Sequence, residues 1–207
     1  MRGKIISFEG CEGSGKTTKL QMLEGYLRER GIDYLLAREP GGTNVSEKIR
    51  SLILSPENAE MTAECEALLY AAARAQLLRE KAEPALAAGK LVVFDRYIHS
   101  SLAYQGEARG LGFDFVKKIN SFAFEKYPPA CTIFLDVTPE AGFLRKCGAD
   151  ENDRMEQAGM AFHNAVYRGY KKIEKEDENF VALDSTDMTK EESFERTIQI
   201  LKDRGVL

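Results

Sequence analysis

The residues with the most recognisable chemistry form a glycine-rich segment close to the start of the chain. It matches the pattern G-x-x-x-x-G-K-[ST], in which glycines let the backbone turn so that its N–H groups point at phosphates. Lys16 adds a cation near the β- and γ-phosphates, and the Thr17 hydroxyl can bind magnesium. We therefore predict a P-loop that binds a nucleoside triphosphate through Gly10, Cys11, Glu12, Gly13, Ser14, Gly15, Lys16, Thr17 and Thr18.

A second group of candidate residues follows an apolar run at residues 91–94, which ends in Asp95 and Arg96. P-loop enzymes place a carboxylate at the end of such a strand, where it holds the hydration shell of magnesium. Arg96 would project from the carboxyl end of the sheet, where open α/β sheets bind their ligands. The structural alternative for Asp95 is a helix cap or a surface turn. We expect Mg²⁺ as the cofactor, held by Thr17 and Asp95, with Lys16, Asp95 and Arg96 as catalytic residues.

Positioning these residues requires a sheet, and the apolar pattern supplies one. Continuous apolar runs, rather than alternating ones, are typical of parallel strands that are covered on both faces. Because the predicted strands and helices alternate along the chain, they indicate an α/β layered fold with right-handed crossovers. The predicted strands are residues 5–8, 34–37, 91–94, 131–135 and 180–183, and the predicted helices are residues 16–29, 45–54, 62–88, 113–126, 155–176 and 190–204.

Length and composition exclude several classes of protein. The 207 residues suggest one domain spanning 1–207, and 43% hydrophobic residues are enough for a packed core. The 29 basic and 33 acidic residues give a net charge of −4, which disfavours a nucleic-acid polymer as partner. The four cysteines form no CxxC pair and only two histidines are present, so a zinc cluster is disfavoured. With no signal-peptide core and no apolar stretch of membrane-spanning length, we expect a cytoplasmic protein with no membrane partner.

Several further motifs, spread over about 5–184, resemble the dTMP (thymidylate) kinases. Switch GTPases are disfavoured because the chain lacks Asn-Lys-x-Asp and Asp-x-x-Gly, whereas a small phosphotransferase fits the length. The resemblance is carried by Arg38-Glu39-Pro40-Gly41-Gly42-Thr43, by Asp95-Arg96-Tyr97 with Ser100-Ser101-Leu102-Ala103-Tyr104-Gln105-Gly106, by Tyr70 with Arg74, and by Leu135-Asp136-Val137. It implies a three-layer P-loop kinase fold with a five-stranded parallel sheet, helices on both faces and a short lid.

The resemblance also implies the reaction, which is transfer of the γ-phosphoryl group of Mg-ATP to dTMP on the route to dTTP, by a homodimer. The acceptor is already a phosphate oxygen, so it needs cations that hold two anions in line rather than a general base. By resemblance, Arg38, Arg50 and Arg96 surround the acceptor phosphate. The remaining substrate-binding residues implied by the resemblance are Glu12 at the sugar 3′-hydroxyl, Tyr104 at the ribose 2′ position, Glu39, and Tyr70, Arg74, Ser101 and Gln105 at the base.

The expected lid, residues 145–154, departs from the family pattern. Relatives that lack a P-loop arginine generally carry an arginine-rich lid, but here position 12 is Glu and the lid balances three cations with three acids. Asp153-Arg154-Met155-Glu156 resembles the end of such a lid, which makes Arg154 the first candidate for the catalytic cation at the donor phosphates. Arg145 and Lys146 come next, and a solvated Arg154 at a helix start is the structural alternative.

Other functions stay open at this point. The acceptor could be another monophosphate or a deoxynucleoside, in which case Glu39 is the one plausible base for the sugar 5′-hydroxyl. A nucleotide-binding protein without turnover is disfavoured by the intact set of Lys16, Thr17, Asp95 and Arg96. His99 lies within the Asp95–Tyr104 stretch, and we expect it to be a solvent-facing loop residue.

Overall fold

Five parallel strands form the centre of the computed structural model, which describes residues 3–146 and 154–207. The strand order is β2-β3-β1-β4-β5, and every neighbouring pair is parallel. All five predicted strands are confirmed. Each extends one or two residues further at its carboxyl end than predicted. Their bounds are β1 (Ile5–Gly10), β2 (Tyr34–Arg38), β3 (Leu91–Asp95), β4 (Cys131–Asp136) and β5 (Phe180–Asp184). The predicted five-stranded α/β fold is therefore confirmed.

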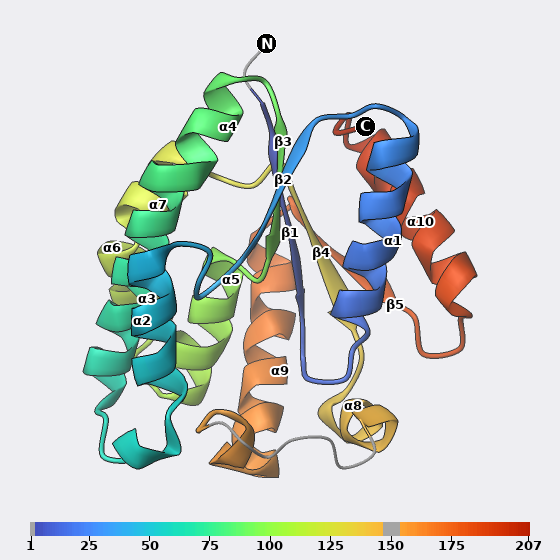
Figure 1. Cartoon of the computed structure of the whole chain (residues 1–207). Helices are drawn as coiled ribbons and strands as arrows, with labels where there is room; N and C mark the ends of the chain where they lie inside the picture. Colours follow the sequence, from blue (N-terminus) through green and yellow to red (C-terminus); the bar gives the residue numbers. More distant parts are fainter. Residues whose placement is uncertain (1–2, 147–153) are drawn as a thin grey trace.

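Helices connect the strands and cover both faces of the sheet (Figure 1). The first part of the chain supplies α1 (Lys16–Glu29), α2 (Asn44–Leu54), η1 (Pro56–Asn58), α3 (Ala63–Leu77), η2 (Leu78–Ala82), α4 (Glu83–Ala87), α5 (Ile98–Ser101) and η3 (Leu102–Ala108). The second part supplies α6 (Phe113–Ile119), α7 (Ser121–Lys126), α8 (Pro139–Lys146), η4 (Glu156–Ala158), α9 (Met160–Glu176) and α10 (Lys190–Asp203).

Some helix predictions need correction. The predicted helix 62–88 is interrupted by the π-helical turn η2, and the predicted helix 113–126 divides at Asn120. The helical segment formed by α5 and η3 was not predicted, because its apolar residues follow the Asp95–Arg96 motif without a clear period. The helix α8 was not predicted either, and the short helix η4 falls inside the predicted helix 155–176. The expected lid residues 147–153 lie outside the described residues.

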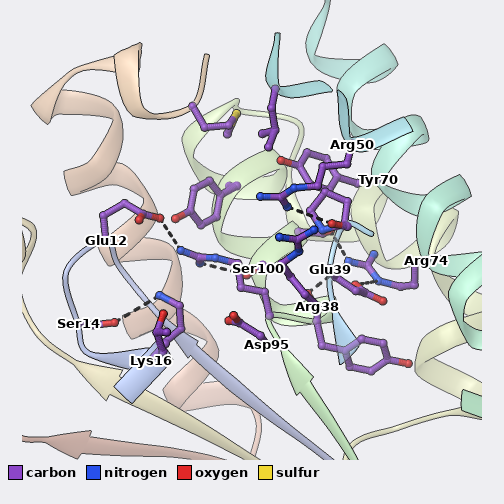
Figure 2. Close-up of a pocket in the computed structure, with 18 of the residues that line it drawn as sticks. Glu12, Ser14, Lys16, Arg38, Glu39, Arg50, Tyr70, Arg74, Asp95 and Ser100 are labelled. Atoms are coloured by element: carbon purple, nitrogen blue, oxygen red, sulfur yellow. Dashed lines mark hydrogen bonds and ion pairs between the residues drawn. The ribbon is translucent and has the colours of Figure 1, made fainter. Parts of the chain in front are cut away.

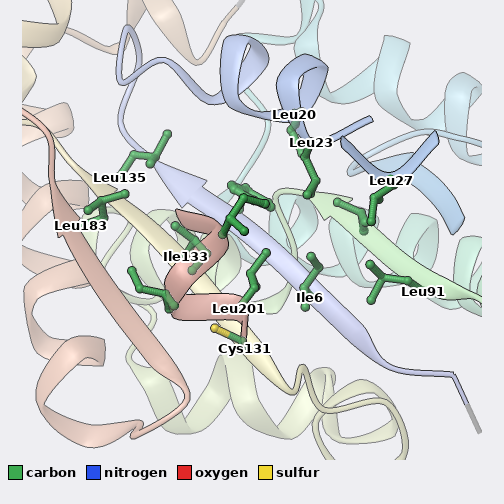
Figure 3. Packing of buried hydrophobic residues seen from close by; sticks show 14 residues of the cluster. Ile6, Leu20, Leu23, Leu27, Leu91, Cys131, Ile133, Leu135, Leu183 and Leu201 are labelled. Atoms are coloured by element: carbon green, nitrogen blue, oxygen red, sulfur yellow. The ribbon is translucent and has the colours of Figure 1, made fainter. Parts of the chain in front are cut away.

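The core explains why the strands are apolar throughout. Along β1 and β3, successive side chains point to opposite faces, so that Ile6 and Val93 enter one cluster while Ile5 and Val92 enter another. Figure 3 shows the first cluster, in which leucines of α1 and α10 pack on the sheet. The other face is covered by α3 to α7 and by α9, as Figure 1 shows. A parallel sheet covered on both faces requires apolar residues on both sides of each strand.

The connections place the candidate motifs at one edge of the sheet. Parallel strands all end at the same edge of the sheet. The strands β2 and β3 lie on one side of the central strand β1, and β4 and β5 lie on the other side. Open α/β sheets bind ligands at such a switch point. The loop between β1 and α1 lies at this edge beside α8 (Figure 1). Over the described residues, none of the helices is long and apolar enough to cross a membrane.

Candidate active site

A cavity of ≈ 460 Å³ opens at the carboxyl ends of β1, β2 and β3, within the usual range for small-molecule sites. It is bounded by the loop after β1, the loop after β2, α3, and the segment from β3 to η3. Most of the predicted site residues line it, and Figure 2 shows how they converge. The predicted residues that line the cavity are Glu12, Gly13, Ser14, Gly15, Lys16, Thr17, Arg38, Glu39, Arg50, Tyr70, Arg74, Asp95, Arg96, Ser101, Tyr104 and Gln105.

Four predicted site residues do not line this cavity: Gly10, Cys11, Thr18 and Arg154. Gly10 has a φ of 153° and sets the turn out of β1, while the Cys11 side chain is buried in the core. Burial raises the pKa of the Cys11 thiol to about 12, so it stays a neutral thiol. Thr18 is exposed in the first turn of α1.

The phosphate end of the cavity is formed by the loop after β1 and the start of α1. Gly15 precedes the helix with a φ of 89°, a left-handed conformation that suits glycine, and the first residues of α1, Lys16 and Thr17, line the cavity. Lys16 Nζ donates to the carbonyl oxygens of Gly10 at 2.9 Å and Cys11 at 3.1 Å. Burial, and to a smaller extent the nearby Arg96 charge, lowers the pKa of Lys16 to about 8. An ammonium group held in this loop is placed to meet a polyphosphate.

Arg96 lines the cavity and contacts the loop after β1. It is the one residue other than glycine with a positive φ among those described, 65°, in the turn that follows β3. Its Nη2 lies 2.6 Å from Oε1 of Glu12, and its Nη1 donates to the Gly10 carbonyl oxygen at 3.0 Å. The guanidinium also lies 5.3 Å from the ring centroid of Tyr104. The loop after β1 and the turn after β3 therefore orient one arginine between the two ends of the cavity.

Glu9 is a buried carboxylate next to Arg96 that sequence reasoning missed. Its Oε1 accepts from the backbone N–H groups of Tyr97 at 2.8 Å and Ser100 at 3.2 Å. Its Oε2 accepts from the hydroxyls of Ser100 at 2.6 Å and Tyr170 at 2.8 Å, and both hydroxyls lie near Arg96 Nη1. These bonds hold the turn after β3 against β1. A charged residue inside an apolar strand was the available signal, because buried charges require partners.

The end of β2 and the helix α2 bring two more arginines, Arg38 and Arg50, to the cavity. Arg38 Nη2 contacts both carboxylate oxygens of Glu47 at 3.1 Å, and the Gly42 N–H donates to Glu47 at 2.7 Å. Arg50 Nη1 donates to the Pro40 carbonyl oxygen at 3.0 Å. Arg38 is exposed and Arg50 half-buried, so both guanidinium groups lie at the cavity rather than in the core. Figure 2 shows Arg38 and Arg50 close together, and with Arg96, which also lines the cavity, they form an arrangement suited to a phosphate.

The far end of the cavity is built on α3. Tyr70 and Arg74 are one turn apart and both line the cavity, as the family resemblance implies. Arg74 is 2% exposed and its Nε donates to Glu39 Oε2 at 2.7 Å, while Nη2 donates to the Ser101 hydroxyl at 3.0 Å. Asn120 and the Tyr97 carbonyl oxygen accept its other N–H groups. A guanidinium held by four partners beside an aromatic ring can read one edge of a planar base.

Glu39, Gln105 and Tyr104 complete this end of the cavity. Burial raises the pKa of Glu39 to about 7, although Arg74 opposes the shift, and Glu39 Oε1 is buried without a hydrogen-bond partner among the described residues. Gln105 is 1% exposed and donates its carboxamide N–H to Glu66 at 2.8 Å. The Tyr104 hydroxyl is also buried without a partner there. Two unpaired polar atoms at a cavity wall are typical of a binding site rather than of a core.

Thr17 and Asp95 fit the expected magnesium ion by the chemistry of their donors. Both line the phosphate end of the cavity and offer oxygen, which is the donor that Mg²⁺ prefers. Among the described residues no group of three or more His, Cys, Asp or Glu side chains could hold a metal ion. A magnesium ion therefore requires phosphate and water ligands besides these two residues, as is usual for nucleotide-bound magnesium.

The lid candidates lie in different places. Arg145, at the end of α8, lines the cavity and donates to the Thr186 carbonyl oxygen at 3.2 Å. Arg154 instead donates to the Ile53 carbonyl oxygen at 3.0 Å and pairs with Glu66 at 2.5 Å, with only 9% of its side chain exposed. The alternative of a solvated Arg154 is thus wrong, and the structure offers no support for Arg154 at the phosphates. Nothing is described of the Lys146 side chain.

Similarity to known proteins shows the family of the chain. The family model for thymidylate kinases matches residues 8–196, which include every residue described above as lining the cavity. The chain belongs to the thymidylate kinase family. It is 46% identical over 207 residues to the thymidylate kinase of Geobacillus sp. (strain WCH70), covering 99% of this chain and 98% of that protein. The thymidylate kinase of Geobacillus thermodenitrificans is 49% identical over 189 residues, or 90% of this chain and 84% of that protein.

A third relative extends the comparison beyond these bacilli. The thymidylate kinase of Finegoldia magna is 46% identical over 203 residues, covering 98% of this chain and all of that protein. The family resemblance drawn from the motifs is therefore confirmed over nearly the whole chain. One residue of these motifs was misjudged: His99 is 1% exposed and pairs with Asp177 at 2.9 Å, so the expected solvent-facing histidine is wrong. Its partner is 78 residues away in sequence, and no local pattern indicates that contact.

Proposed function

We propose that this thymidylate kinase family member transfers the γ-phosphoryl group of Mg-ATP to dTMP, giving dTDP on the route to dTTP. The observation that carries this proposal is one cavity with a P-loop at one end, an aromatic–arginine pair at the other, and three arginines between them. The P-loop end suits the triphosphate, and the arginine cluster suits the acceptor phosphate. The Tyr70 ring and the Arg74 guanidinium suit a pyrimidine, by stacking and by donation to a ring carbonyl.

The proposed reaction needs positioning more than proton transfer. A phosphate oxygen of dTMP is already a nucleophile near neutral pH, so the residues must hold two anions in line and stabilise the charge that spreads over the moving group. Arg38 and Arg50 hold the acceptor, while Arg96 and Lys16 contact the transferred phosphoryl group and its neighbours. Thr17 and Asp95 would hold a magnesium ion together with the nucleotide, and the ion would supply further positive charge there. Glu12 both orients Arg96 and faces the sugar of the acceptor.

Deoxynucleoside phosphorylation is the less favoured alternative. It requires a general base, for which Glu39 was the one plausible candidate. The Oε2 atom of Glu39 accepts from Arg74 Nε at 2.7 Å, so this carboxylate supports the base-reading guanidinium. The arginine cluster also has no role if the acceptor carries no phosphate.

The test is an acceptor panel in a coupled assay of ADP release with ATP and magnesium. We expect dTMP to be strongly preferred over UMP, CMP and thymidine, because the family resemblance places the Tyr104 ring at the ribose 2′ position and the arginines require a phosphate. Equal activity with UMP or CMP would contradict the pocket assignment. Greater activity with thymidine would favour the nucleoside kinase.

We further propose that the chain forms a homodimer and that it is a cytoplasmic protein. Val45 and Leu52 on α2 and Leu68 on the adjacent α3 are about half exposed, which supports an apolar contact surface on these helices. Light scattering after size-exclusion chromatography would test this, with Leu68→Glu expected to give a monomer. A monomeric wild-type chain would contradict the dimer.

A further inference from the structure

Glu66 is a fully buried carboxylate that the proposed reaction does not use. It lies on α3 four residues before Tyr70 and eight before Arg74, so the three side chains share one face of the helix. Its side chain is 0% exposed, whereas Tyr70 and Arg74 line the cavity (Figure 2). A buried charge destabilises the fold unless it is paired and hydrogen-bonded, so Glu66 requires partners.

Within residues 3–146 and 154–207, three side chains contact the Glu66 carboxylate. Gln105 Nε2 donates to Oε1 at 2.8 Å. Arg109 makes a two-pronged contact, with Nε 3.2 Å from Oε1 and Nη2 3.1 Å from Oε2. Arg154 Nη2 lies 2.5 Å from Oε2. Two guanidinium groups thus compensate the charge of Glu66, and the remaining donor is the carboxamide of a residue that lines the substrate cavity.

The chemistry of this contact determines which way the Gln105 carboxamide faces. A carboxylate accepts hydrogen bonds and donates none, so the NH₂ group of Gln105 must face Glu66. The carboxamide oxygen is then turned away from Glu66. Because Gln105 lines the cavity beside Tyr70 and Arg74, this end of the cavity presents an acceptor from Gln105 and a donor from Arg74, the second N–H of Nη1 that the four contacts above do not use.

We propose that Glu66 is a positioning residue that selects the pyrimidine through Gln105, an inference that rests on the proposed function. Thymine and uracil carry an N–H at N3 beside a carbonyl at C4, which matches an acceptor beside a guanidinium. Cytosine carries an acceptor at N3 and an amino group at C4, so both contacts become repulsive. If the carboxamide of Gln105 were free to rotate, its NH₂ group could face the base and cytosine would be tolerated. Glu66 prevents that rotation.

The test measures kcat/KM for dTMP, dUMP and dCMP with Glu66→Met, which removes the acceptor and keeps the side-chain volume. We expect the dTMP to dCMP ratio to fall about tenfold or more, because sites that pair buried polar groups discriminate by such factors. The dTMP to dUMP ratio should stay within about twofold, since both bases carry the N3 proton. General damage to the pocket would lower all three rates together and leave both ratios in place.

Arg109→Met is the matched control, because it removes another partner of Glu66 and leaves the Glu66–Gln105 bond intact. It should keep the wild-type dTMP to dCMP ratio. If the unpaired arginines prevent Glu66→Met from folding, the double variant E66M/R109M removes one of them and should show the same loss of discrimination. In a Gln105→Leu background, Glu66→Met should cause no further change in the ratio.

The proposal is overturned if folded Glu66 variants keep the wild-type ratio, or if Glu66→Met still lowers it in the Gln105→Leu background. A measurement on the wild-type chain needs no variant. The Gln105 carboxamide protons in the dTMP complex should exchange slowly with solvent by NMR, and rapid exchange would refute the contact with Glu66. These outcomes differ from failure of the proposed function, in which the wild-type chain itself shows no preference for dTMP.

Discussion

The contact between the phosphate loop and α8 leads to a prediction for Gly142→Ala. A Cβ at Gly142 would lie 2.1 Å from the Glu12 carbonyl oxygen, whereas ordinary contacts begin at 3.4 Å. The two segments must therefore separate by about 1.3 Å. The Glu12 carboxylate orients Arg96, and Arg145 lies one turn after Gly142, so the displacement reaches both. We expect kcat/KM for dTMP to fall about tenfold to a hundredfold, since shifts of about 1 Å at a catalytic site have effects of this size.

Stability should fall together with activity. Overpacking costs about 1–3 kcal/mol of unfolding free energy, and each kcal/mol lowers Tm by about 2–4 °C in a chain of this length. Gly25→Ala in α1 is the matched control, because its Cβ would meet nothing within 4 Å. Helix propensity alone predicts about 0.5–1 kcal/mol of stabilisation at both positions. Calorimetry and steady-state kinetics on the two variants therefore separate the effect of helix propensity from the effect of the steric contact at Gly142. A Gly142→Ala protein with unchanged Tm and kcat/KM would refute the reasoning.

Three further predictions concern the cations of the site. Because burial lowers the pKa of Lys16 to about 8 and a triphosphate favours the ammonium form, ATP binding should take up protons near pH 8 and weaken as the pH rises from 7 to 9. Calorimetry in two buffers with different ionisation heats measures this uptake, and its absence would contradict the assignment. Arg96→Ala should lower kcat by a factor of about 10² or more while leaving ATP affinity within a few-fold, and an unchanged kcat would remove Arg96 from the mechanism. Arg145→Ala should lower kcat about tenfold or more, whereas Arg154→Ala should mainly lower Tm through the loss of its Glu66 pair; two neutral kcat values would point to Lys146 or the backbone.

The motifs predicted most of the cavity because their information is local. The P-loop segment is continuous, and its glycines and Lys16 act through backbone geometry that nearby residues determine. The three arginines that line the cavity between its ends, Arg38, Arg50 and Arg96, and the Tyr70–Arg74 pair were found through the family resemblance. Their convergence on one cavity follows from a general property of parallel sheets, whose carboxyl ends meet at one edge.

The residues that were missed or misjudged depend on contacts between distant segments. Glu9 and Ser100 are 91 residues apart, Glu66 and Arg154 are 88 apart, and His99 and Asp177 are 78 apart. Each pair is buried or partly buried, and no spacing along the chain indicates which acid meets which donor. That Arg154 reaches the phosphates stays a prediction from its place in a motif; in the structure Arg154 pairs with Glu66 of α3.

The sequence by itself determined the secondary structure of the sheet, the phosphate loop and the family, because apolar runs and short motifs are properties of neighbouring residues. Only the tertiary structure decided the strand order, the partner of each buried charge and the close approach of Gly13 and Gly142, where a Cβ on Gly13 would lie 2.0 Å from the Gly142 carbonyl oxygen. Packing is a property of surfaces brought together from distant parts of the chain, and a buried polar group is stable only with the partner that packing supplies.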